Sequence, residues 1–174
     1  MRPVRLTLRR ALIASTVVAA VGATGACTND GEGASGRAPR KSPATVGAPL
    51  SGVAIDVRND PGCNCCTSWV EYLREHGATV ELSEDADRDS FRDGRGISDE
   101  AASCHTAIVN GYAVEGHVPV GAIARLLRDR PEAAGLALPG MPADGPGMGG
   151  DARTWEAQPV MLVTDGGDLT PFEY

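Results

Sequence analysis

The segment PGCNCCTSWVEYLREHG, residues 61–77, is the part of the chain that most constrains its fold. It places Cys63, Cys65 and Cys66 within four positions, directly before a stretch whose apolar residues recur with helical spacing. Neighbouring residues such as Cys65 and Cys66 cannot bridge each other without backbone strain. Thiols crowded in this way make a poor framework of structural disulfides, so they predict a reactive or metal-binding site at the start of a helix.

The residues around these cysteines predict a strand–loop–helix–strand unit. A β-branched strand at 53–57 precedes the cysteines, a helix capped by residue 67 or 68 runs to about residue 76, and a second strand follows at 79–82. A helix N-terminus carries unpaired N–H groups and a partial positive charge, which favour the thiolate form of a cysteine placed there.

The remaining segments predict the rest of an α/β domain. They comprise irregular helical turns within 83–103, strands at 106–109 and 112–115 joined by an Asn-Gly turn, a helix at about 120–130, a Gly/Pro-rich loop at 135–150 and a last strand at 160–164. This order is typical of a thioredoxin-like fold, with a central mixed sheet flanked by helices. That fold also carries its reactive cysteines at the start of the first helix.

The N-terminal third of the chain predicts export. Residues 1–26 combine four arginines with a short apolar run, as a secretory signal peptide does; an uncleaved anchor helix is the alternative. The run TGAC resembles the lipobox of bacterial lipoproteins, which would place a lipid on Cys27 and the protein at the outer face of the cell membrane or in the periplasm. Residues 27–52, rich in Gly, Ser, Ala and Pro, predict a disordered tether, and residues 53–174 predict the folded domain.

Charge narrows the range of partners. Removing residues 1–26 takes away four arginines and no acidic residue, which changes the formal net charge from −7 to −11. Such a charge disfavours nucleic acid and anionic membrane surfaces, and it suits the attraction of cations. We therefore expect metal ions as partners, no nucleic acid, and membrane contact only through a lipid anchor.

Several separated motifs resemble one known family. CNCCTSWVEYL, SCHTAIVNGYAVEGHVP, IARLL and GLALPGMPADGPGM together resemble the CopG-type periplasmic copper-resistance proteins, a thioredoxin-like group. The resemblance runs from about residue 53 to the C-terminus and implies copper binding by the CxCC cysteines, with a role in handling or oxidising Cu(I) and contact with other copper-handling proteins. By position, it implies metal ligands at Cys63, Cys65, Cys66, Cys104, His105, His117, Met141 and Met148. The chain departs from the family at residues 96–98, where Gly-Ile-Ser replaces the usual Gly-Val-Pro.

Position in the fold points to the same residues. Counting back from Asn110-Gly111, the position that faces the reactive cysteines in a thioredoxin-like fold falls near His105, with Cys104 just before it. Cys104 is therefore expected to approach Cys63 in space. Thiolate and thioether sulfur suit Cu(I), and imidazole also suits Cu(II). We expect copper, as one Cu(I) ion or several, to be held by the cysteines, with the histidines and the two loop methionines assisting.

Other interpretations of the same residues stay open. Cys63 and Cys66 also form a C-x-x-C motif, so the chain is alternatively a thiol–disulfide oxidoreductase, although a third thiol inside the motif favours metal. A copper metallochaperone without redox turnover is a further alternative, and zinc is a competing metal. A structural disulfide with a spare thiol is the plainest interpretation. Glu115 is either a partner of His117 or a solvated strand residue.

Overall fold

The computed structural model describes residues 47–174. The predicted signal peptide, Cys27 and the tether up to residue 46 lie outside the described residues. Leu50, which falls within the predicted tether, is fully buried in the core, and its N–H donates to the carbonyl of His76 at 3.0 Å. Within the described part of the chain, no helix is long and apolar enough to span a bilayer.

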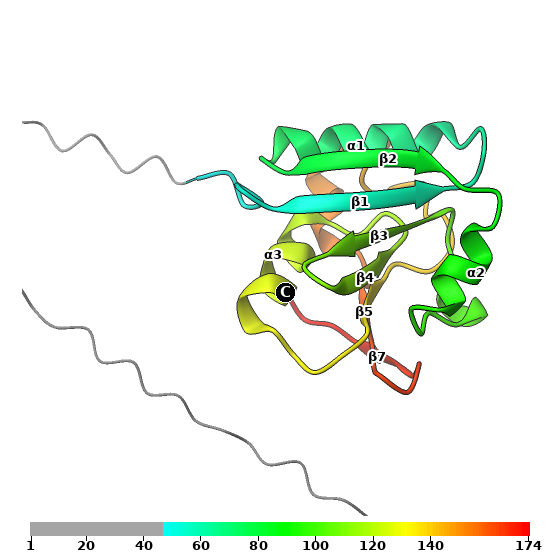
Figure 1. Ribbon diagram of the computed structural model, residues 1–174. Helices are drawn as coiled ribbons and strands as arrows, with labels where there is room; N and C mark the ends of the chain where they lie inside the picture. Colours follow the sequence, from blue (N-terminus) through cyan, green and yellow to red (C-terminus); the bar gives the residue numbers. More distant parts are fainter. Residues whose placement is uncertain (1–46) are drawn as a thin grey trace, which may run out of the picture. The chain divides into compact units, whose positions relative to one another are not determined.

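The described residues form one mixed sheet with helices on both faces (Figure 1). In chain order the elements are β1 (Ala54–Asn59), α1 (Asn64–Glu75), β2 (Thr79–Glu84), α2 (Arg88–Asp93), η1 (Asp99–Ala101), β3 (His105–Val109), β4 (Tyr112–Glu115), α3 (Val120–Asp129), β5 (Gly135–Ala137), η2 (Ala152–Ala157), β6 (Met161–Val163) and β7 (Leu169–Pro171), where η denotes a 3₁₀ helix.

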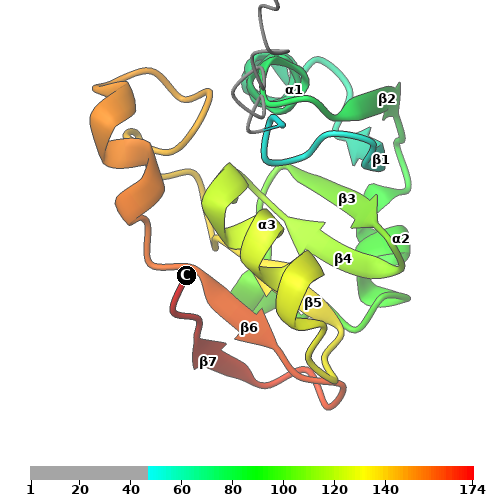
Figure 2. The same ribbon diagram turned by 90° about the vertical axis from the view of Figure 1, so that its left-hand side faces the viewer.

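The sheet order is β2-β1-β3-β4-β5-β6-β7. The pairs β1–β2 and β4–β5 are parallel, and the other neighbouring strands are antiparallel. Figure 2 shows α1 and α3 on one side of the sheet and α2 on the other. The predicted α/β class, with a central mixed sheet flanked by helices, is confirmed.

The core explains why these helices form where they do. The apolar stripe of α1, with Trp69, Val70 and Leu73 fully buried, packs with Ile123 and Leu126 of α3 in one large cluster against the sheet. A smaller cluster around Ile97 fills the opposite face. The apolar residues that recur with helical spacing in the sequence are therefore the ones that are buried. The two clusters cover both faces of the sheet.

Three elements differ from the sequence-based expectation, one of them strand β7, which follows the predicted last strand and pairs with β6. Helix α1 begins at Asn64, and its N-cap residue, Cys63, lies four residues before the earlier of the two predicted caps, residue 67. Cys63 is extended and makes no side-chain capping bond. Cys65 and Cys66 therefore lie in the first helical turn. Strand β5 forms inside the predicted loop, because Gly135 lets the chain pair flush with β4: a Cβ there would lie 1.7 Å from the Ala113 oxygen.

The register of β1 and β3 creates the site. These strands are antiparallel, and Asn59 at the end of β1 faces His105 at the start of β3. The loop that leaves β1 and the residue that enters β3 therefore meet at one edge of the sheet, where the Asp60 N–H donates to the Cys104 carbonyl at 3.3 Å. This geometry brings Cys104 beside the N-terminus of α1.

Candidate metal centre

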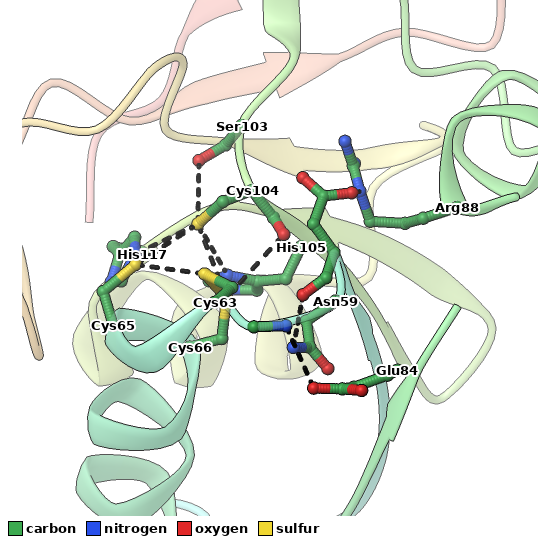
Figure 3. The surroundings of a disulfide bond; sticks show 12 residues. Asn59, Cys63, Cys65, Cys66, Glu84, Arg88, Ser103, Cys104, His105 and His117 are labelled. Atoms are coloured by element: carbon green, nitrogen blue, oxygen red, sulfur yellow. Dashed lines mark hydrogen bonds and ion pairs between the residues drawn. A yellow bond between two sulfur atoms is a disulfide. The ribbon is translucent and has the colours of Figure 1, made fainter. Parts of the chain in front are cut away.

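Four cysteine sulfurs meet at the N-terminus of α1 (Figure 3). Cys63 and Cys66 are joined in a disulfide, whereas Cys65 and Cys104 are free. The Cys65 Sγ lies 3.2 Å from the Cys63 Sγ and 3.7 Å from the Cys104 Sγ. The Cys66 Sγ lies 3.6 Å from the Cys104 Sγ. Each of the four sulfurs is thus within contact distance of at least one other. Cys104 is 39 residues from Cys65 and 38 residues from Cys66 in the sequence, so the fold brings these sulfurs together.

Two buried imidazoles extend the cluster behind Cys104. Its Sγ lies 3.4 Å from the His105 Nδ1 and 3.5 Å from the His117 Nε2, and Cys104, His105 and His117 form a second group of candidate ligands. The His117 Nδ1 lies 2.7 Å from the Pro146 carbonyl oxygen, which can only accept, so this nitrogen carries the proton. The His117 Nε2 lone pair therefore points at Cys104, ready to accept a proton or to bind a metal.

His105 is held differently. Its ring packs against the indole of Trp69, with ring centroids 4.4 Å apart, and against the ring of His117 at 4.9 Å. The His105 Nε2 is buried without a hydrogen-bond partner among the described residues. An unpaired buried nitrogen carries a desolvation cost. The His105 nitrogen that lies next to the cysteine cluster is Nδ1, 3.4 Å from the Cys104 Sγ.

Burial sets the protonation of the site. Desolvation lowers the pKa of both His105 and His117 below the ordinary histidine value, so both rings are neutral near pH 7. Burial, and then the neighbouring Cys65, raise the pKa of Cys104 to about 12. Cys104 is therefore a thiol in the metal-free site, and a metal that binds its sulfur must displace the proton.

A buried carboxylate fixes the segment that carries Cys104. Glu115 on β4 is fully buried and accepts hydrogen bonds from the Ser103 N–H at 2.7 Å and from the Thr106 hydroxyl at 2.6 Å, one on each side of Cys104 and His105. Arg88 of α2 lies 3.3 Å from the same carboxylate. Both interpretations of Glu115 drawn from the sequence are wrong: its side chain is buried and not solvated, and His117 bonds to the Pro146 carbonyl instead.

Arg88 connects this network to the cysteine loop. Only 5 % of its side chain is exposed, and its Nε donates to Asp60, in the loop between β1 and α1, at 2.8 Å. The same guanidinium therefore contacts both segments that deliver sulfur, one through Asp60 and the other through Glu115. No pattern in the sequence indicates this role, because Arg88 is one of three arginines in the acidic stretch at 83–103.

The segment from β5 to η2, residues 138–151, closes the other side of the centre. Pro146 fixes His117, and the Ser103 hydroxyl donates to the Gly140 carbonyl at 2.5 Å. The two methionines predicted as ligands lie in this segment: Met148 is half-buried, and 60 % of Met141 is exposed. The structure thus brings together six of the eight predicted ligands, the four cysteines and two histidines, and leaves most of Met141 in solvent.

Gly147 anchors this segment on α1, which leads to a testable expectation. Its φ is +79°, and a Cβ would lie 2.5 Å from the Trp69 backbone nitrogen. Gly147→Ala should therefore destabilise the domain by more than the roughly 1–3 kcal/mol that a left-handed conformation costs a non-glycine residue. Urea denaturation measures the loss. Gly140→Ala is the matched control, with φ of +72° and no atom within 4 Å of the added Cβ. Equal losses in the two variants would contradict a role for the contact with α1.

These features define an α/β domain whose sheet edge gathers cysteine sulfur and imidazole nitrogen around one candidate soft-metal site. Two solved structures, named Copper resistance protein copG Form 1 and Form 2, match the chain at 36 % identity with TM-scores of 0.63 and 0.62. Each match covers 70 % of this chain. It also covers 97 % of the Form 1 chain and 98 % of the Form 2 chain. The chain therefore belongs to the CopG family of copper-resistance proteins.

Comparisons with family models and with curated proteins add one match. A family model described as a protein of unknown function, DUF411, matches residues 101–148, the stretch from just before Cys104 to Met148. No curated protein matches the sequence. The resemblance inferred from the sequence motifs is confirmed.

Proposed function

We propose that this domain, once the Cys63–Cys66 disulfide is reduced, binds Cu(I) through Cys63, Cys65, Cys66 and Cys104. Membership of the CopG family and the cysteine cluster support a copper-related metal-binding protein. The single observation that carries the choice of Cu(I) is the convergence of four sulfurs within 3.2–3.7 Å contacts in a member of a copper-resistance family, since thiolate sulfur is a ligand that Cu(I) prefers.

Cys104 connects the two groups of candidate ligands. It belongs both to the four-cysteine group and to the group with His105 and His117, so its sulfur can bridge ions held on either side. The thiolate side suits Cu(I), whereas two imidazoles with one thiolate also suit Cu(II). This division of donors supports a role in cycling the oxidation state of copper during copper resistance, with Met141 and Met148 as additional soft donors.

The proposed cellular context follows the N-terminal sequence. Residues 1–26 would direct export, residues 27–52 would tether the domain, and a lipid on Cys27 would hold it at the outer face of the membrane. In that setting the domain would meet copper ions and other copper-handling proteins. Transfer of Cu(I) to such a partner without redox turnover, as a metallochaperone does, uses the same ligands.

One observation favours a second candidate function. Cys63 and Cys66 are joined in a disulfide at the start of α1, the arrangement that a C-x-x-C oxidoreductase uses. A thiol–disulfide oxidoreductase acting through these two cysteines would need neither Cys65 nor copper.

Cys65→Ser separates the two functions. If the site binds Cu(I), the reduced variant should lose at least the roughly 10–100-fold in affinity that removing an outer-shell partner costs, because a ligand itself is lost. Competition of the reduced full-length chain against a Cu(I) chelator measures this. Cys63 and Cys66 remain in the variant, so a dithiol oxidoreductase should keep its disulfide reductase activity. Unchanged Cu(I) affinity together with that activity would overturn the copper proposal.

A further inference from the structure

The Cys63–Cys66 disulfide leaves two cysteines unassigned. Cys65 and Cys104 are free, and their sulfurs are 3.7 Å apart. Neither belongs to the C-x-x-C pair, and they come from different segments, the first turn of α1 and the residue before β3. A single dithiol exchange needs only the Cys63–Cys66 pair. It does not need the second, unbonded pair of sulfurs that lies directly beside it.

We propose that Cys65 and Cys104 form a second disulfide, so that the site has a fully oxidised state in which both pairs are closed and no thiolate is left for metal. The disulfide itself is inferred from the sulfur geometry alone, and only its effect on metal binding rests on the proposed copper function. The centre would then exist in three forms: four free thiols, one disulfide as in this structure, and two disulfides.

The pairing follows from the positions of the sulfurs. With Cys63 and Cys66 joined, Cys65 has Cys104 as its free-thiol neighbour within the described residues. The two sulfurs must approach from 3.7 Å to about 2.05 Å, which a modest change in the side-chain rotamer of Cys65 can supply. Cys65 makes this movement, because hydrogen bonds to Glu115 on both sides hold the segment of Cys104 in place.

The reaction balances with a low-molecular-weight disulfide, such as oxidised glutathione, as the oxidant. Half-buried Cys65 attacks the small disulfide first, forming a mixed disulfide and releasing one small thiol. Cys104 then passes its proton to the His117 Nε2, 3.5 Å away, and attacks the sulfur of Cys65, which forms the Cys65–Cys104 bond and releases the second small thiol. The two protein thiol protons leave on the two small thiols, and two electrons pass to the oxidant. Only Cys65 has to meet the oxidant, which suits the burial of Cys104.

The second disulfide would couple copper binding to redox state. Metal ligation needs thiolates, so the doubly oxidised site should not bind Cu(I) until a dithiol reductant reopens it. Conversely, Cu(I) that occupies the reduced cluster should protect all four cysteines from oxidation, since binding to one state stabilises that state.

Peptide mapping tests the proposal directly. The full-length chain with Cys27→Ser is reduced, titrated with oxidised glutathione without oxygen, acid-quenched, alkylated in denaturant and digested with trypsin. Cleavage after Arg58, Arg74, Arg95 and Arg125 puts Cys63, Cys65 and Cys66 on residues 59–74 and Cys104 on residues 96–125. We expect these two peptides to be joined at the endpoint, with the link mapped by fragmentation to Cys65 and Cys104 and none of the four cysteines alkylated.

Cys104→Ser is the matched control. It keeps the Cys63–Cys66 pair but cannot resolve the mixed disulfide, so glutathione should remain attached to Cys65. Two results would overturn the proposal. One is a wild-type endpoint with Cys63 and Cys66 joined while Cys104 is still alkylated. The other is a cross-link that maps to Cys66 instead of Cys65.

A Cu(I) titration of the same preparations keeps this inference separate from the proposed function. Reduced protein should bind Cu(I), the doubly oxidised protein should not, and treatment with a dithiol should restore binding. Tight binding by reduced protein without any cross-link would sink the second disulfide and leave copper binding intact. A cross-link in a protein that never binds Cu(I) would support the second disulfide and reject the copper function.

Discussion

Replacing Glu115 by alanine is expected to destabilise the domain by about 3–5 kcal/mol, the cost of removing one partner from a buried ion pair. Arg88 would lose its fully buried partner, and the Ser103 N–H and the Thr106 hydroxyl would lose their acceptor. The loss should fall toward the lower end of the range, because Arg88 keeps Asp60 and Asp89 as partners. Urea denaturation of the full-length chain measures it.

Glu115→Gln is the control that keeps volume and one acceptor oxygen. It should cost clearly less than the alanine variant, since burial already opposes the charge: desolvation outweighs the hydrogen bonds and raises the pKa of Glu115. A raised folded-state pKa means stability that is present below the unfolded value, about 4.3, and is lost as pH rises through the folded value. The wild type should therefore lose stability relative to Glu115→Gln across that window. Equal, small losses for both variants would show that this carboxylate does not hold the Cys104 segment.

Local patterns made much of the fold predictable. Helical spacing of apolar residues located α1 and α3, and β-branched runs with an Asn-Gly turn located the strands from β1 to β4. Their order then implied that Cys104 would face the cysteine loop, because the antiparallel register of β1 and β3 is part of that topology. The sulfur cluster was thus foreseeable from local signals combined with one fold-level argument.

Features that depend on tertiary contacts were not predictable in this way. Strand β5 is only three residues long, and its pairing depends on Gly135 fitting against Ala113, which no local propensity reports. The contact between Arg88 and Glu115 joins residues 27 apart, from segments that separately looked like solvated surface. The carbonyl of Pro146 that orients His117 comes from a loop with no periodicity at all.

Cys104→Ser should weaken Cu(I) binding by the reduced protein more than Cys65→Ser does, and by more than about 100-fold, the upper end of the effect of outer-shell changes. The reason is its position: Cys104 belongs to both candidate ligand groups, so its loss depletes the thiolate cluster and also separates that cluster from His105 and His117. A serine hydroxyl is a hard donor and does not replace sulfur for Cu(I). Chelator competition gives the affinity, with Cys27→Ser as a control for the same chemical change outside the described residues.

Proton release gives this prediction a readout that a general loss of packing would not produce. Because the pKa of Cys104 is raised to about 12, the metal-free site carries this proton at neutral pH, and Cu(I) must displace it on binding. Wild-type affinity should therefore rise with pH, and Cys104→Ser should release about one proton fewer per binding event. Unchanged affinity and unchanged proton release in Cys104→Ser would confine the metal to the loop of Cys63, Cys65 and Cys66. The sulfur before β3 would then serve packing or disulfide chemistry alone.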